Sequence, residues 1–148
     1  MSETLSSIRD KVKAMLQDDA NLVFDPATIE SCIRFALDEY GLAKGAVQTI
    51  SGLDGAVTTT VPDLESIIIQ IGAAGYAVEG RVVKRSEGFN FKQYIPREIR
   101  SWGDSRIEDF HRMLECVRTG TFNGANAVPW HNHGWAMDRW DPNGGGGV

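Results

Sequence analysis

The segment DPATIESCIRFALDEYG, residues 25–41, carries the clearest structural signal in the chain. Asp25 is a favourable N-cap, and Pro26 suits the first helical position, where its missing N–H leaves no hydrogen bond unmade. Gly41 provides the left-handed residue that often ends a helix. Apolar side chains recur between them at helical spacing: Ile29, Cys32, Ile33, Ala36, Leu37 and Tyr40. The segment predicts an amphipathic helix from about Pro26 to Tyr40, in which Cys32 is a small core residue.

Upstream of this helix, the chain carries a second apolar stripe. Four residues share the helical spacing: Leu5, Ile8, Val12 and Met15. The sequence DDAN at 18–21 interrupts the pattern, and acidic residues at a helix C-terminus oppose the macrodipole. We expect a short first helix that ends near Gln17.

Downstream, residues 46–61 have the composition of β structure. Two runs rich in β-branched residues, 47–50 and 57–61, flank the pair Asp54-Gly55. An Asp-Gly pair between such runs predicts a β-hairpin. An isolated two-stranded hairpin is marginally stable in water, so this one is expected to pack on helices or on another chain.

A third helix is predicted from about Asp63 to Arg85, with a middle portion made of very small residues. These are Gly72, Ala73, Ala74, Gly75 and Ala77. A glycine inside a helix costs about 1 kcal/mol relative to alanine. Close approach of another helix would offset that cost, and we assign Gly72, Ala73, Gly75 and Tyr76 to packing between subunits.

The region from Tyr94 to Val117 is predicted to be mostly helical, with Pro96 near its start and Gly103 dividing it. Its second half carries a clean apolar stripe: Ile107, Phe110, Leu114 and Val117. Gly120 is expected to close the helix. The fold class is therefore mainly α, a small bundle of about four helices with one β-hairpin, in a body that spans residues 1–120.

Residues 121–148 form a second region with no helical or alternating period. They hold three of the four tryptophans, Trp130, Trp135 and Trp140, together with Pro129 and four consecutive glycines at 144–147. Tryptophan is enriched at binding hot spots, so the region is predicted to be an extended arm that orders on a partner. The alternative is that the tryptophans fold back on helices of their own chain.

Composition and charge restrict the class of protein. The chain has 148 residues, two cysteines and a net charge of -5. It has no apolar run of the roughly 20 residues that a membrane span requires, and its first residues do not resemble a signal peptide, so we expect a soluble protein made in a reducing compartment. The acidic balance argues against a general nucleic-acid coat protein.

Positive charge is concentrated in one part of the chain. Residues 1–80 hold 5 Lys/Arg against 12 Asp/Glu, whereas residues 81–118 hold 9 against 6. Six cations in the second part are candidates for weak contacts with DNA phosphates or with an acidic partner: Arg81, Lys84, Arg85, Lys92, Arg97 and Arg100. The alternative is a solubilising helix end, where cations also suit the dipole.

No catalytic motif stands out. His131 and His133 could share one face of an extended segment, but zinc needs three or four ligands and no further ligand lies nearby in the sequence. His111 and Cys116 would lie on different faces of a helix, which disfavours a Cys/His nucleophile pair. We predict no enzymatic activity, no cofactor and no metal.

Three segments in this order resemble the head–tail connector, or adaptor, proteins of tailed bacteriophages. The first is DPATIE at 25–30, which follows a short amphipathic helix and a break; the second is IRFALDEY at 33–40; the third is the small-residue helix IGAAGYAVEGR at 71–81. A last long helix around 110–117 completes the pattern. The resemblance covers about residues 5–118.

The resemblance implies a structural function. Such adaptors form a ring, usually about twelve-fold, beneath the portal protein of a filled capsid. The ring extends the DNA channel and docks the next neck or tail protein, so this chain is expected in the neck of the virion, and in the host cytoplasm before assembly. C-terminal arms in the family often reach the portal, which suggests the same for the arm with Pro129, Trp130, Trp135 and Trp140.

Two other classes of function stay open at this point. One is a different phage neck or tail component, or a small helical interaction module. The other, less favoured, is a metal-dependent enzyme that uses His131 and His133.

Overall fold

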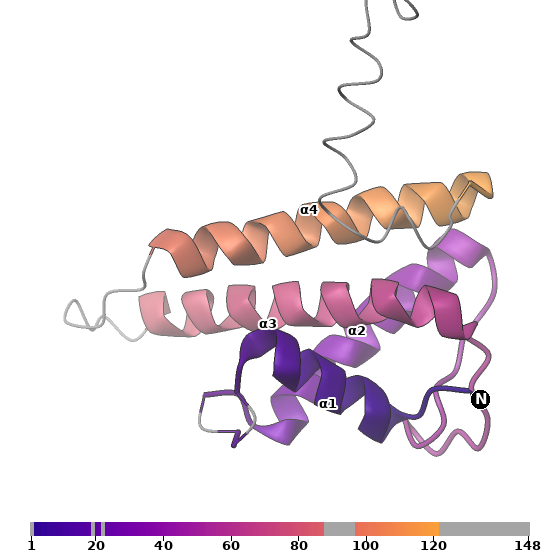
Figure 1. Ribbon diagram of the computed structural model, residues 1–148, viewed down its shortest axis with the longest axis horizontal. Coiled ribbons are helices and arrows are strands. Elements are labelled where there is room, and N and C mark those ends of the chain that lie inside the picture. The colour runs from indigo at the N-terminus through magenta and orange to yellow at the C-terminus, as the bar shows by residue number, and fades with distance from the viewer. Residues whose placement is uncertain (1, 19, 22, 88–96, 122–148) are drawn as a thin grey trace, which may run out of the picture.

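The computed structural model describes residues 2–18, 20–21, 23–87 and 97–121, and within them the chain is mainly helical (Figure 1). The four α-helices are α1 (Leu5–Leu16), α2 (Pro26–Lys44), α3 (Ser66–Glu87) and α4 (Arg97–Thr119), and a short 3₁₀ helix, η1 (Asp63–Glu65), leads into α3. The mainly helical class is confirmed for this part of the chain. The predicted arm lies outside the described residues from position 122 onward.

Helix α3 is the centre of the bundle and contacts each of the other three helices. Figure 1 shows α4 lying along one side of α3 and α1 on the other, while α2 crosses behind α3 and also contacts α4. Helices α3 and α4 are also those with the most extensive mutual contact. The apolar faces predicted from the sequence all turn inward around α3.

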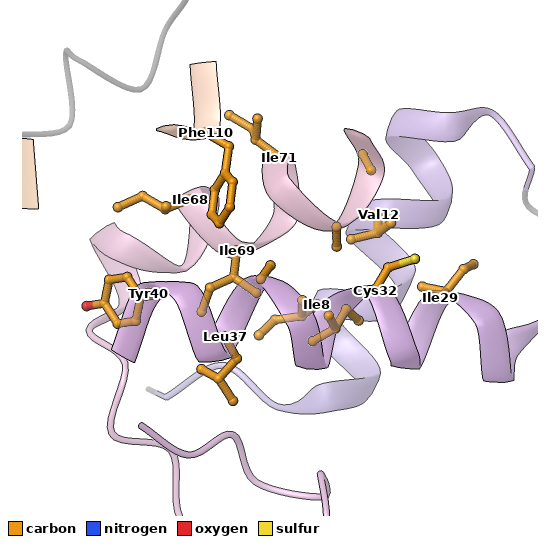
Figure 2. Packing of buried hydrophobic residues seen from close by; sticks show 14 of the residues in the cluster. Ile8, Val12, Ile29, Cys32, Leu37, Tyr40, Ile68, Ile69, Ile71 and Phe110 are labelled. Atoms are coloured by element: carbon orange, nitrogen blue, oxygen red, sulfur yellow. The ribbon is translucent and has the colours of Figure 1, made fainter. Parts of the chain in front are cut away.

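The core is built from the predicted stripes. Ile8 and Val12 of α1, Ile33 of α2 and Ile68 of α3 are fully buried, and Figure 2 shows residues of all four helices, Phe110 of α4 among them, meeting in one cluster. Cys32 lies in this cluster, as predicted for a small core residue (Figure 2).

Side chains cap the first two helices, and the start of α2 at Pro26 is the one predicted from the sequence. The Asp25 carboxylate accepts a hydrogen bond from the Thr28 amide at 2.8 Å, with Pro26 as the first helical residue. The hydroxyl of Thr4 caps α1 by accepting from the Ser7 amide at 3.2 Å. These side chains satisfy amide groups that have no partner inside the helix.

The predicted end of α2 at Tyr40 is wrong, because the helix continues through Gly41 to Lys44 and ends at Gly45 in the left-handed conformation. The chain turns back at 45–48 and crosses α2 at Gly41, where an added Cβ would lie 3.1 Å from the carbonyl oxygen of Ala46. Gly41 therefore serves a close backbone approach. Gly120, with φ of 74°, does close α4 as predicted.

The predicted hairpin at 46–61 has its turn but not its strands. Asp54 and Gly55 both have positive φ, as a tight Asp-Gly turn requires. No residue from 46 to 61 belongs to a strand, and an isolated bridge between Thr4 and Ser51 is the β pairing found there. The prediction of two paired strands is therefore wrong.

Threonine hydroxyls explain the missing strands. The Thr49 amide donates to Thr60 Oγ1 at 2.9 Å, and the Ser51 amide donates to Thr59 Oγ1 at 2.9 Å. These side chains take the backbone donors that a second strand would have paired, which is the usual way short polar side chains compete with a ladder. The loop is held instead by burial of Ile50, Leu53 and Val61.

Candidate assembly surface

The small-residue face of α3 is filled by α4 of the same chain. A Cβ atom added to Gly72 would lie 2.7 Å from Phe110 Cδ2, and one added to Gly75 would lie 2.8 Å from Ile107 Cγ1. Ala73 is fully buried. The close approach of another helix is therefore confirmed, but the assignment of Gly72, Ala73 and Gly75 to a neighbouring subunit is corrected, because these residues have no surface left to offer.

Gly103 takes part in the same interface from the side of α4. An added Cβ there would lie 2.7 Å from Val78 Cγ1. The predicted division at Gly103 is wrong, since α4 runs without interruption from Arg97 to Thr119. Glycines on both helices remove the side-chain volume that would hold the two axes apart.

Tyr76, the fourth residue predicted to contact another subunit, is half-buried and joins three helices. Its hydroxyl donates a hydrogen bond to Glu39 of α2, and its ring packs edge-on against Phe110 at 5.9 Å between centroids. His111 Nε2 lies 3.5 Å from the same Glu39 carboxylate. Burial, then the contact with Glu39, raises the pKa of Tyr76, so the phenol keeps the proton that it donates.

A second tyrosine–carboxylate pair joins the neighbouring residue of α2 to η1. The hydroxyl of Tyr40 donates to Glu65 of η1, and Lys44 Nζ lies 3.0 Å from the same carboxylate. Burial is the main reason that the pKa of Tyr40 is raised, with the Glu65 hydrogen bond next. The two pairs fix α2 against the elements that follow the loop.

Arg81 is engaged within its own chain. Its Nη1 donates to the carbonyl oxygen of Val23 at 3.1 Å, and its guanidinium lies 5.8 Å from the centre of the Phe24 ring. Arg100 is exposed. Lys84, Arg85 and Arg97 lie in α3 and α4 with side chains outside the described set, and Lys92 is outside the described residues altogether. The six candidate cations thus include one with a structural role.

The surface that best fits an interface was not singled out from the sequence. Phe35 and Leu42 are seven residues apart on α2 and stand 62% and 81% exposed, on the side opposite the core. Val47, 91% exposed, follows in the turn after the helix. Leu42 and Val47 line an open groove of about 390 Å³ together with Leu37, Gly41, Gly45 and neighbouring residues. We call Phe35, Leu42, Val47 and this groove the α2 outer surface.

The amphipathic pattern of α2 indicates from the sequence that Phe35 and Leu42 are exposed. Phe35 and Leu42 fall outside the apolar stripe that ends at Tyr40, at positions where a solvent-facing helix normally carries polar residues. Single exposed apolar residues are common on proteins, but Leu42 and Val47 both line one groove and are therefore candidates for a contact surface.

The described residues contain no group of three or more His, Cys, Asp or Glu side chains that could hold a metal ion. His131 and His133 lie outside those residues, as do Pro129, Trp130, Trp135 and Trp140. In the same described part of the chain, none of the helices is long and apolar enough to cross a bilayer.

Comparison with models of protein families, with curated proteins and with solved structures finds no match to this chain.

Proposed function

We propose that this chain is a structural adaptor of a tailed-phage neck, which assembles into a ring between the portal protein and the tail. The order of elements supports this reading: two N-terminal helices, an excursion at 46–61, a helix of small residues and a long last helix. That order is the one implied by the resemblance to head–tail connector proteins.

The α2 outer surface is the observation that carries the proposal. A closed ring uses a heterologous interface, in which one face of each subunit meets a different face of the next. Burial of large apolar side chains at such an interface contributes about 25 cal/mol per Å² of apolar area removed from water. Phe35, Leu42 and Val47 provide that area without disturbing the core, since each already points outward.

The remaining roles follow from the proposed ring. The arm beyond residue 121 binds the portal or an adjacent subunit, and the next neck or tail-completion protein docks on the opposite side. Arg100 and the cations whose side chains are not described make weak, salt-screened contacts with DNA in the channel. The chain is then a virion component that passes through the host cytoplasm.

The test is assembly on the portal protein encoded by the same genome. The two proteins are co-expressed, purified together and imaged by electron microscopy, and a ring of this chain beneath the portal is the expected result. Phe35→Ser and Leu42→Ser should abolish the ring while the free protein keeps its helical circular dichroism.

Val57→Ser is the control, because Val57 is also a large apolar residue that is exposed, and it is not among the residues of the α2 outer surface. It should leave the ring intact. No ring with the unaltered chain would refute the adaptor function, whereas normal rings with Leu42→Ser would refute the part played by the α2 outer surface.

A further inference from the structure

A second apolar hollow lies at the opposite end of the bundle from the α2 outer surface. It is an open pocket of about 470 Å³ between the end of α1, the 18–24 turn, α3 and the start of α4. Its walls are mostly apolar: Met15, Leu16, Val23, Phe24, Val78, Ile99 and Trp102. We call it the α1–α4 pocket.

The pocket is held open by fixed groups. The Asp18 carboxylate accepts hydrogen bonds from the amides of Val23, at 3.1 Å, and Phe24, at 2.7 Å, which shapes the turn that forms one wall. Arg81 spans from α3 to the same turn. Val23 and Ile99 stand 45% and 49% exposed at the mouth, so large apolar side chains face water there.

The chemistry of the pocket suits an indole. A tryptophan side chain has a broad apolar body and one N–H donor, and it is best accommodated where one end is apolar and the other meets a polar acceptor. Glu98 and Gln17 provide carboxylate and amide oxygens among the lining residues. The guanidinium of Arg81 adds a cation that can lie over an aromatic face.

Three tryptophans of the same chain lie beyond the described residues. Trp130, Trp135 and Trp140 follow the end of α4 at five-residue intervals. Three indoles left in water would be an aggregation hazard, so a docking place on the chain's own body lowers the free energy of the unassembled protein.

The length of chain between the end of α4 and each tryptophan favours one of the three as the occupant of the pocket. From Trp102 at the pocket to Thr119 at the end of α4, the helix covers about 26 Å at 1.5 Å per residue. Trp130 is nine residues beyond Thr121 and reaches about 30 Å only when fully extended, whereas Trp135, fourteen residues beyond, reaches about 46 Å. Trp140 reaches as well but closes a longer loop at a greater entropic cost.

We propose that Trp135 of the C-terminal arm docks in the α1–α4 pocket of its own chain in the free protein. The arm is thereby stored on the body, and release of the indole makes it available to a partner. This inference does not depend on the phage adaptor function, and it is tested on the isolated full-length chain.

The experiment uses the full chain labelled with 5-fluorotryptophan, whose four ¹⁹F resonances are assigned with single Trp→Phe variants. A neutral gadolinium chelate in solution broadens exposed indoles. We expect Trp135 to be protected and Trp140 to be broadened. Ile99→Glu, at the mouth of the pocket, should expose Trp135, whereas Leu42→Glu, at an exposed helical position on the other surface, should not.

The methyl resonances of Ile99, which lines the pocket, give a second measure of whether an indole occupies it. The δ1 methyl of Ile99 should carry a ring-current shift that Trp135→Leu removes. If all three arm indoles are equally broadened, the proposal is overturned. It is also overturned if Phe89→Leu removes the methyl shift and Trp135→Leu does not, or if dilution abolishes the protection, since the occupant would then be another segment or a second copy.

Discussion

Replacement of Gly72 by alanine should destabilise the protein, although the same replacement in an exposed helix stabilises it. Alanine is favoured over glycine in a helix interior by about 1 kcal/mol. At Gly72 a steric clash opposes this gain, because the added Cβ would lie between 2.7 and 2.9 Å from three ring carbons of Phe110. Phe110 is fully buried and packs edge-on against Tyr76.

The magnitude follows from these two opposing effects. Overpacking a well-packed core costs typically about 1–3 kcal/mol. A contact under 3 Å to a buried ring belongs at the upper end, so Gly72→Ala should lower the free energy of unfolding by about 1–2 kcal/mol after the gain in helix propensity.

Gly80 provides a matched control in the same helix. It is exposed, and a Cβ added there meets nothing within 4 Å. Gly80→Ala should therefore raise the free energy of unfolding by about 1 kcal/mol. Urea unfolding followed by far-ultraviolet circular dichroism measures both variants. If Gly72→Ala is as stable as Gly80→Ala, the α3–α4 interface is not as close as the structure shows.

Three further predictions concern stability and reactivity. Asp18→Ala should cost about 1–3 kcal/mol in urea unfolding because it strands the amides of Val23 and Phe24, with Asp18→Asn less damaging; equal stability of both with the unaltered chain would contradict this. Burial raises the pKa of the Cys32 thiol from 9.0 to about 11, so between these pH values the folded state binds more protons than the unfolded state. The contribution of Cys32 to the free energy of unfolding should therefore be complete below pH 9 and be lost between about pH 9 and 11. Unfolding measured as a function of pH should show this loss, and Cys32→Ala should reduce it. At pH 8 iodoacetamide should modify Cys116 and leave the buried Cys32 intact until the protein unfolds, with mass spectrometry of the digested protein as the measurement.

The helices could be predicted from the sequence because their signals are local. The N-cap at Asp25 with its following proline and the apolar stripe that includes Ile29 and Ile33 act within a few residues of one another, so the structure confirms them. The C-terminal end of α2 does not depend on local signals alone. Whether Gly41 ends the helix or allows a close crossing depends on where residues 45–48 return, which is a tertiary matter.

The loop at 46–61 shows another limit of local reasoning. β-branched residues predicted strands, but threonine has a hydroxyl as well as a branched Cβ, and here the hydroxyls of Thr59 and Thr60 bind backbone amides. Valine or isoleucine at these positions could not do so. The exposure of Phe35 and Leu42 could be predicted, because both fall outside the apolar stripe of α2, but the groove beside Leu42 could not, since it depends on where residues 45–48 return.

The contact between Thr4 and Ser51 has a consequence for how the native protein opens. The Leu5 amide donates to the Ser51 carbonyl oxygen at 2.9 Å, and the Thr59 hydroxyl donates to the Glu3 carbonyl oxygen at 2.6 Å. These bonds join segments far apart in sequence, and each closes a long loop. They are therefore expected to form late in folding. Hydrogen exchange should therefore find the Leu5 and Ser51 amides opening together, as one cooperative unit that separates before the α3–α4 pair.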